Sequence, residues 1–427
     1  MSENNVLVIF GSTGDLTYQK LLPALADLLK RQPTILQKIL LIGRQGNTLE
    51  AYLQYGLDRG LDLTAIQSIL PLIEYVYLQA TESKEYRQLS SILSNFKGRY
   101  VYLATPPTMF HLITENLFQH GLIQKNNLNH RCAYEKPFGE NTSTAEVLNQ
   151  LLHESLDEKQ IYRVDHYLAK PLIQQLIKLR MQWATVGMEK LWTSSHIQRI
   201  DILAYESVGI LSRGKFYDAT GALKDMIQSH LLETLALLLM ELPNRIDDVG
   251  TIQQAKINFL KSLTPLMDEI IFGQYDGYLQ ETNVNPSSLT ETFVSLPLRS
   301  SLERWKETSI TIQTGKKLEE KKTQIIIHWL TGGTLTFNIS PQVNLAYTSN
   351  WFSTLSIPLQ KHVVALSHHP FAKHDAYANV FSDFIMGNQT LFPSNNEIMA
   401  TWSLIDKIKE KALLPKPYLL LHDLLKG

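Results

Sequence analysis

Short apolar runs separated by stretches with helical spacing organise the first third of the chain. The runs lie at residues 6–10, 39–42, 75–78, 100–104 and 132–134. Such runs, alternating with helices, are typical of strands that are buried on both faces of a parallel sheet. The pattern predicts βαβ units in an α/β, Rossmann-type domain over residues 1–165.

The first helix of this domain is predicted over residues 16–31, where leucines recur at spacings of three and four. Pro23 lies inside this span and has no N–H to donate. We therefore expect the regular part of the helix to begin late.

After residue 198 the apolar pattern changes to longer β-rich segments with few helices between them. They lie at residues 199–206, 291–299, 309–314, 323–330 and 334–339, and the "TGG" at 331–333 predicts a hairpin between the last two. Strands in close succession usually form an antiparallel sheet. The sequence predicts a C-terminal α+β domain over residues 166–427 with a large, mainly antiparallel sheet.

The composition narrows the functional classes. The chain has 427 residues, and its 40 basic and 41 acidic residues nearly cancel, which argues against a general nucleic-acid or membrane-surface binder. Cys132 is the single cysteine, so no intrachain disulfide forms. The longest apolar block, residues 231–242, contains Glu233 and is too short to span a bilayer. No basic, apolar leader follows "MSENN", and we expect a cytoplasmic protein without membrane or nucleic-acid partners.

A glycine loop joins the first predicted strand to the first helix. Gly11 and Gly14 of "FGSTGDL" lie where glycine lets the backbone approach a phosphate and where a helix N-terminus offers free N–H groups. Thr13 replaces the usual middle glycine of G-x-G-x-x-G. The loop indicates a dinucleotide site, although glycine turns after strands also occur in proteins that bind no ligand.

The end of the second predicted strand distinguishes between cofactors. In dinucleotide-binding folds an acid at this point holds a ribose hydroxyl, whereas an arginine accepts a 2′-phosphate. Arg44 of "LIGRQGN" occupies the position, and no acid occurs between residue 39 and Glu50. NADP is therefore favoured over NAD; the alternative is that Arg44 is a solvated surface residue.

Titratable residues cluster in "RVDHYLAKP", residues 163–171. Pro171 disfavours a helical Lys170 and suits the first position of a helix over residues 171–183. His166, Tyr167 and Lys170 at this helix entry could converge on an anion such as a phosphate. The alternative is a salt-bridged structural turn.

A second titratable group, His230, lies in the largely apolar segment 224–240, which predicts a buried helix. Oxidation of an alcohol by a nicotinamide dinucleotide needs a base for the hydroxyl proton, and histidine suits neutral pH. Asp165 is available to orient such a base. A buried histidine is also often a core residue that takes no part in catalysis.

Several motifs occur in collinear order along nearly the whole chain. They are "FGSTGDLTYQKLLPAL", "YLATPPTMF", "EKPFGEN", "YRVDHYLAK", "LWTSSHI", "RGKFYDATGALKDMIQSHLLETL", "GYLQETNVNPSSLTETF", "GKKLEEKKTQIII" and "DAYANVFSDFIMGNQTLF". Together they resemble the glucose-6-phosphate dehydrogenase family. The resemblance implies oxidation of glucose 6-phosphate at C1 to the 6-phosphogluconolactone with NADP, or alternatively NAD, as hydride acceptor.

The resemblance also implies roles for individual residues. The general base falls on His230 and its orienting acid on Asp165. The substrate ligands fall on His166, Tyr167, Lys170, Lys316 and Lys321 for the phosphate, on Glu206 and Asp225 for the sugar hydroxyls, and on Lys136 where sugar and cofactor meet, with Pro137 expected to be cis. The cofactor positions fall on Gly11, Ser12, Thr13, Gly14, Asp15, Leu16, Lys20, Arg44 and Lys136. No metal is implied, and homodimers or homotetramers are implied through the sheet domain.

The chain departs from the family pattern at several positions. Ala169 and Pro171 replace a glycine and a glutamate, Ser229 replaces an asparagine before the base, and the loop at Arg44 is about two residues shorter. Lys215, Ala219 and Thr220 also differ. The chain ends soon after residue 413, so we expect no second, structural NADP site. The alternatives are a glucose-fructose-oxidoreductase-type enzyme, which would not need Lys170, Lys316 and Lys321, and an inactive cofactor-binding subunit.

Overall fold

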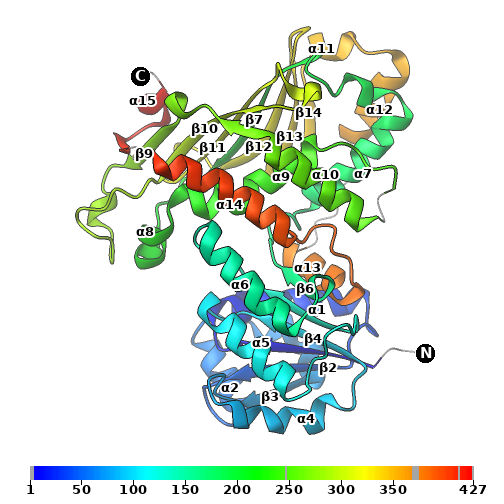
Figure 1. The fold of residues 1–427 in the computed structure, drawn as a ribbon, viewed down its shortest axis with the longest axis vertical. Helices are drawn as coiled ribbons and strands as arrows, with labels where there is room; N and C mark the ends of the chain where they lie inside the picture. The colour runs from blue at the N-terminus through cyan, green and yellow to red at the C-terminus, as the bar shows by residue number, and fades with distance from the viewer. Residues whose placement is uncertain (1–3, 246–247, 368–374, 412–413, 426–427) are drawn as a thin grey trace. The chain divides into compact units, whose positions relative to one another are not determined.

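The computed structural model describes residues 4–245, 248–367, 375–411 and 414–425, which form two compact units (Figure 1). The first unit comprises Met1–Ala169 and Lys373–Ile398, and the second comprises Lys170–Ala372 and Met399–Gly427. The sequence analysis assigned everything after residue 165 to the second domain. The structure instead groups α13, Ala376–Met386, with the first unit.

The first unit is built on a six-stranded, fully parallel sheet. Its strands are β1 (Asn5–Phe10), β2 (Lys38–Gly43), β3 (Ile73–Tyr77), β4 (Gly98–Leu103), β5 (His130–Tyr134) and β6 (Ile161–Arg163). They lie in the order β3-β2-β1-β4-β5-β6. The order reverses between β1 and β4, and in sheets of this kind ligands bind at the carboxyl ends of the strands at that point. The five predicted strands are confirmed, and β6 is an addition.

Helices cover the sheet of the first unit. They are α1 (Leu22–Arg31), α2 (Leu49–Leu57), α3 (Leu63–Ile66), α4 (Arg87–Leu93), α5 (Phe110–Gln119), α6 (Thr142–Ser155) and α13. A π-helical turn, η1 (Thr17–Leu21), precedes α1, so the regular helix begins late, as Pro23 predicts. In this turn the N–H of Leu22 donates to the carbonyl of Thr17, five residues back.

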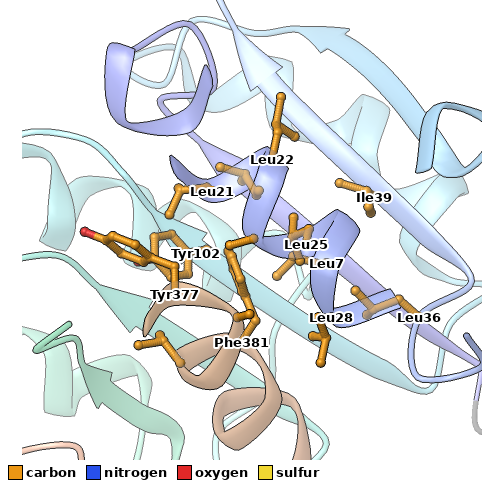
Figure 2. Packing of buried hydrophobic residues seen from close by; sticks show 14 of the residues in the cluster. Leu7, Leu21, Leu22, Leu25, Leu28, Leu36, Ile39, Tyr102, Tyr377 and Phe381 are labelled. Carbon is orange, nitrogen blue, oxygen red and sulfur yellow. The ribbon is translucent and has the colours of Figure 1, made fainter. Parts of the chain in front are cut away.

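The core of the first unit lies between the sheet, α1 and α13 (Figure 2). Leu21, Leu25 and Leu28 of η1 and α1 are fully buried here. Phe381 of α13 packs on Tyr102 of β4 with ring centroids 5.1 Å apart. This aromatic face of α13 explains why a segment so late in the chain belongs to the first unit.

The second unit contains a nine-stranded, mostly antiparallel sheet. Its strands are β7 (Ile197–Tyr205), β8 (Leu263–Pro265), β9 (Ile271–Tyr275), β10 (Phe293–Ser300), β11 (Ser309–Gly315), β12 (Lys322–Trp329), β13 (Thr334–Ser340), β14 (Asn344–Tyr347) and β15 (Lys416–Tyr418). The order is β14-β13-β12-β7-β11-β10-β9-β15, with β8 paired to β10, and only β7 with β11 and β9 with β15 run parallel. The predicted fold class and the hairpin between β12 and β13 are confirmed.

The helices of this part of the chain are α7 (Pro171–Thr185), α8 (Gly214–Ala222), the π-helical segment η8 (Leu223–Leu231), α9 (Leu232–Leu239), α10 (Val249–Ser262), α11 (Ser349–Ser353), α12 (Ile357–Ser367), α14 (Asn395–Glu410) and α15 (Leu421–Leu425). Every residue of α9 is buried, including Glu233, which pairs with the buried Lys256 at 3.2 Å. Among the described residues no helix combines the length and the apolar character needed to cross a membrane.

Candidate active site

The glycine loop lies at the switch point of the first sheet. Gly11 has φ of +77°, a conformation that only glycine adopts easily, and a Cβ there would lie 2.3 Å from the carbonyl oxygen of Ala104, just after β4. The N–H of Gly14 donates to the carbonyl of Gly11 at 3.1 Å and closes the turn. The loop therefore brings backbone close to the crevice between β1 and β4, where the helix N-terminus favours an anion.

The side chains of the loop divide between the core and the surface. Ser12 is buried and its hydroxyl donates to the carbonyl of Ile42 at 2.9 Å, while Leu16 packs against the core. Asp15 forms an exposed ion pair with Arg59 at 2.9 Å, and Lys20 is exposed on η1. The backbone of Ser12 is also bonded within the protein, because its N–H donates to the carbonyl of Ile42 at 3.1 Å and its carbonyl accepts the hydroxyl of Tyr52 at 2.9 Å.

Arg44 is exposed and follows β2 directly. A Cβ on Gly43 would lie 2.7 Å from Cγ2 of Thr13, so the end of β2 packs against the glycine loop. The N–H of Gln45 donates to the hydroxyl of Tyr75 at 3.0 Å and fixes the start of this loop. The residue before Arg44 thus packs against the glycine loop.

Lys136 and Asp165, two further predicted site residues of the first unit, follow the ends of β5 and β6. The Lys136–Pro137 peptide is cis, as expected. Glu135 is buried and accepts a hydrogen bond from the hydroxyl of Tyr102. Burial raises the pKa of Glu135 to about 7, against the hydrogen bond from Tyr102 and the charge of Lys136, and the carboxylate of Asp165 adds to the rise. Lys136 and Asp165 therefore lie near the same buried carboxyl group.

Asp165 and the two residues after it form a tight turn beyond β6. Asp165 is 5% exposed, and its Oδ1 accepts the N–H of Tyr167 at 2.9 Å. His166 stacks on the ring of Tyr377 of α13, with centroids 5.6 Å apart and planes 18° apart. Tyr167 is 4% exposed. Sequence reasoning missed Tyr377, although it lies in the segment "DAYANVF" that carried the family resemblance.

The remaining predicted residues belong to the second unit. Lys170 precedes α7 in an extended conformation, with φ of −61° and ψ of 140°, and Pro171 is the first residue of the helix. Both features were predicted from the proline.

Glu206 and Lys316, predicted as sugar and phosphate ligands, form an ion pair with one another. Nζ of Lys316 also lies 5.1 Å from the centroid of the Tyr217 ring, and its carbonyl accepts the hydroxyl of Tyr418 at 2.6 Å. Lys321 is exposed at the end of the connection from β11 to β12. Lys316 is thus fixed from both its side chain and its backbone.

Asp225 and His230 are buried on η8, with 7% and 2% exposure. Tyr217, which sequence reasoning missed, lies near Asp225: burial raises the pKa of Tyr217 well above its usual value, and the charge of Asp225 adds to the rise. Asp225, Tyr217 and Lys316 are therefore neighbours. The segment that carries Asp225 and His230 was predicted as an ordinary helix, and its π-helical form was not anticipated.

The predicted residues thus divide between the units. Those of the first unit lie at the carboxyl ends of its strands, and their close glycine backbone fits a dinucleotide. Those of the second unit lie on η8, at the start of α7 and around the ends of β7 and β11. Across the residues that the structure describes, no group of three or more His, Cys, Asp or Glu is placed to hold a metal.

Family models and a curated relative identify the same protein family for both units. The family model described as "Glucose-6-phosphate dehydrogenase, NAD binding domain" matches residues 8–175, and "Glucose-6-phosphate dehydrogenase, C-terminal domain" matches residues 179–420. The glucose-6-phosphate 1-dehydrogenase of Chlamydia muridarum is 32% identical, over 95% of this chain and 90% of that protein.

Solved structures of glucose-6-phosphate dehydrogenases are also similar to this chain. The chain is similar to the glucose-6-phosphate 1-dehydrogenase of Mycobacterium avium, with a TM-score of 0.84 and 27% identity over 97% of this chain and 94% of that one. It is equally similar, at 25% identity and the same coverage, to a glucose-6-phosphate dehydrogenase in complex with its substrate glucose-6-phosphate.

Proposed function

The chain belongs to the glucose-6-phosphate dehydrogenase family, and on this premise we propose that it oxidises D-glucose 6-phosphate at C1 to 6-phospho-D-glucono-1,5-lactone with NADP. The dehydrogenase activity follows from membership of the family. The preference for NADP and the roles of individual residues are proposals. The observation that carries them is that the proposed acid, base and phosphate ligands are all present among the residues that the structure describes.

We propose that the glycine loop binds the cofactor pyrophosphate. The N–H groups of Ser12 and Gly14 donate to the carbonyls of Ile42 and Gly11, so those of Thr13, Asp15 and Leu16 would be the donors at the helix N-terminus. Asp15 and Lys20 border them on the exposed side. Arg44 would bind the 2′-phosphate, and its exposed position directly after Gly43, which packs against Thr13, supports NADP over NAD. When bound, NADP supplies the nicotinamide that accepts the hydride leaving C1 of the sugar.

The substrate phosphate carries two negative charges and needs several donors. We propose that His166, Tyr167, Lys170, Lys316 and Lys321 supply them. The sugar hydroxyls would bind Glu206 and Asp225, and Lys136 would lie where sugar and cofactor meet. Phosphate binding far from C1 orients the reacting carbon, which can contribute several kcal/mol to lowering the barrier.

The proposed proton acceptor is His230. A ring nitrogen of His230 would take the proton of the C1 hydroxyl as the hydride leaves C1, so the carbonyl of the lactone forms without a charged alkoxide. Asp165 would hold the imidazole in the right orientation and stabilise the imidazolium.

We also propose that the protein is a cytoplasmic homodimer or homotetramer. Buried and partly exposed residues alternate along β12 and β13, so one face of the large sheet is less covered than the other. Polar pairs line that less covered face, including His328 with Asp201 at 2.8 Å and Gln324 with Asn338 at 2.8 Å. Light scattering of the purified protein tests this assembly.

The experiment that tests the function is nicotinamide reduction by the purified protein with glucose 6-phosphate, in parallel with NADP and NAD, and with unphosphorylated glucose as control. The proposal expects phosphate-dependent reduction that is faster with NADP. Equal rates with glucose would favour the glucose-fructose-oxidoreductase type, and ligand binding without turnover would favour an inactive subunit.

A further inference from the structure

The segment η8, Leu223–Leu231, is a π-helix rather than an α-helix. At its end the N–H of Leu232 donates to the carbonyl of Ile227, five residues back. π-Helices are rare and are frequently found at functional sites. We therefore looked for contacts that stabilise this nine-residue π-helix and for a use of it in the proposed reaction.

The use follows from the spacing of Asp225 and His230. In an α-helix with 3.6 residues per turn, residues five apart point about 140° away from each other. In a π-helix, which has more residues per turn, such residues lie on the same side of the helix and much closer together in direction. The π form therefore lets both buried side chains face one substrate, whereas an α-helix would direct one of them elsewhere.

Hydroxyl groups support the widened backbone at both residues. Oγ of Ser229 donates to the carbonyl of Asp225 at 3.0 Å, and Oγ1 of Thr234 donates to the carbonyl of His230 at 2.8 Å. Ser229 departs from the family pattern, and this bond gives it a structural role in the segment.

The start of η8 is held by Glu291, at the end of the loop before β10. Oε1 of Glu291 accepts the N–H of Leu223 at 2.9 Å, and the backbone carbonyl of Glu291 accepts the N–H of Ala222 at 3.0 Å. Gly221, with φ of +68°, makes the kink that precedes them. A Cβ on Gly221 would lie 2.4 Å from Oε1 of Glu291, so the kink and the carboxyl group are in direct contact.

We propose that Glu291 is a positioning residue for the dehydrogenase reaction: it holds the start of the π-helical segment so that Asp225 and His230 face the same substrate. This inference rests on the proposed roles of Asp225 and His230. In this role Glu291 acts through the backbone N–H of Leu223, which its carboxyl group accepts.

The first test compares Glu291→Met, which removes the acceptor, with Glu291→Gln, which keeps an acceptor oxygen of the same shape. Glu291→Met is expected to lower kcat about tenfold or more and to raise the KM for glucose 6-phosphate several-fold, because small misplacements of reacting groups are costly. The KM for NADP should stay within twofold. Glu291→Gln should restore kcat to within about threefold of the wild type.

A merely structural role gives a different result. Loss of folded protein lowers the apparent kcat but leaves both KM values unchanged. Unchanged KM for glucose 6-phosphate in Glu291→Met, or equal impairment of Glu291→Gln and Glu291→Met, overturns the proposal.

The second test uses the contact between Gly221 and Glu291. Gly221→Ala should reproduce the kinetic pattern of Glu291→Met, and the double variant should be no worse than the more impaired single variant, because both changes break one contact. Gly187→Ala is the matched control, since Gly187 also has positive φ, +82°, but a Cβ there meets nothing within 4 Å. Additive losses in the double variant would contradict a shared mechanism.

Failure of the inference and failure of the proposed function are distinguishable. If the wild type does not reduce NADP with glucose 6-phosphate, the function fails. If the wild type is active and His230→Asn is inactive while Glu291→Met is normal, the inference alone fails.

Discussion

Each unit contains one helix that widens into a π-helical turn, and the two turns differ in how the sequence encodes them. In the first unit η1 is followed at once by Pro23, which cannot donate an N–H to the preceding turn. In the second unit η8 contains no proline, and its start is held by Glu291, 68 residues from Leu223. The π-helical turn of the first unit therefore has a proline close by in the sequence, whereas the π-helical segment that carries the proposed base depends on a distant contact.

The two units are therefore expected to affect different steps of the reaction. Changes around η1 and the glycine loop should act on cofactor binding, and changes on η8 should act on turnover. Each of the following variants tests whether cofactor binding and turnover are affected separately.

The largest effect is expected for His230→Asn. Removing the proposed base should lower kcat about 10³-fold, while the Kd for glucose 6-phosphate and the KM for NADP change less than threefold. Initial rates and calorimetry measure these quantities. His111→Asn, on the partly exposed face of α5, is the control. Parallel loss of binding and turnover would show that His230 is a binding or structural residue instead.

The next effect is expected for Gly11→Ala. The new Cβ would meet the carbonyl of Ala104, so the loop must move, and the KM for NADP should rise at least about tenfold while kcat at saturating NADP is kept. Gly121→Ala is the control because Gly121 has a similar φ, +66°, with nothing within 4 Å of its Cβ position. The same rise in both variants would mean that backbone strain, not closeness to the cofactor, is responsible.

A smaller effect is expected for Arg44→Ala. Loss of one charge-assisted contact to the 2′-phosphate should raise the KM for NADP about tenfold. NAD lacks that phosphate, so its KM should stay within twofold and serves as the internal control. An equal change for both cofactors would assign Arg44 to the surface and leave the cofactor preference to other residues.

The smallest effect is expected for Pro23→Ala. With an N–H restored at position 23, the N–H of Leu22 should bond to the carbonyl of Tyr18 instead of Thr17, and the KM for NADP should change less than threefold. A crystal structure of the variant shows the register. If η1 persists unchanged, Pro23 is not its cause and the contrast between the two turns is lost.

Features that depend on local sequence were predicted, whereas features that depend on contacts distant in the chain were not. The five strands of 1–165 named from apolar runs are present because strands buried on both faces leave a continuous signal. The late start of α1, the helix start at Pro171 and the cis Pro137 were also predicted, the last from the family resemblance.

What sequence reasoning missed depends on contacts that are distant in the chain. β6 has three residues and ends where the titratable cluster begins, and β8, β9, β14 and β15 are short, so their apolar signal is weak. Tyr377 reaches His166 through the packing of α13 on the first unit, and Glu291 reaches Leu223 across 68 residues. No local pattern marks either contact.

The most direct test of the account is a single-turnover measurement of NADPH formation with saturating glucose 6-phosphate and increasing NADP, for the wild type, Gly11→Ala and His230→Asn. The account predicts that Gly11→Ala reaches the rate constant of the wild type at high NADP, whereas His230→Asn stays about 10³-fold slower at every NADP concentration. Recovery of His230→Asn at high NADP, or a persistent deficit in Gly11→Ala, would contradict the separation of cofactor binding from proton transfer.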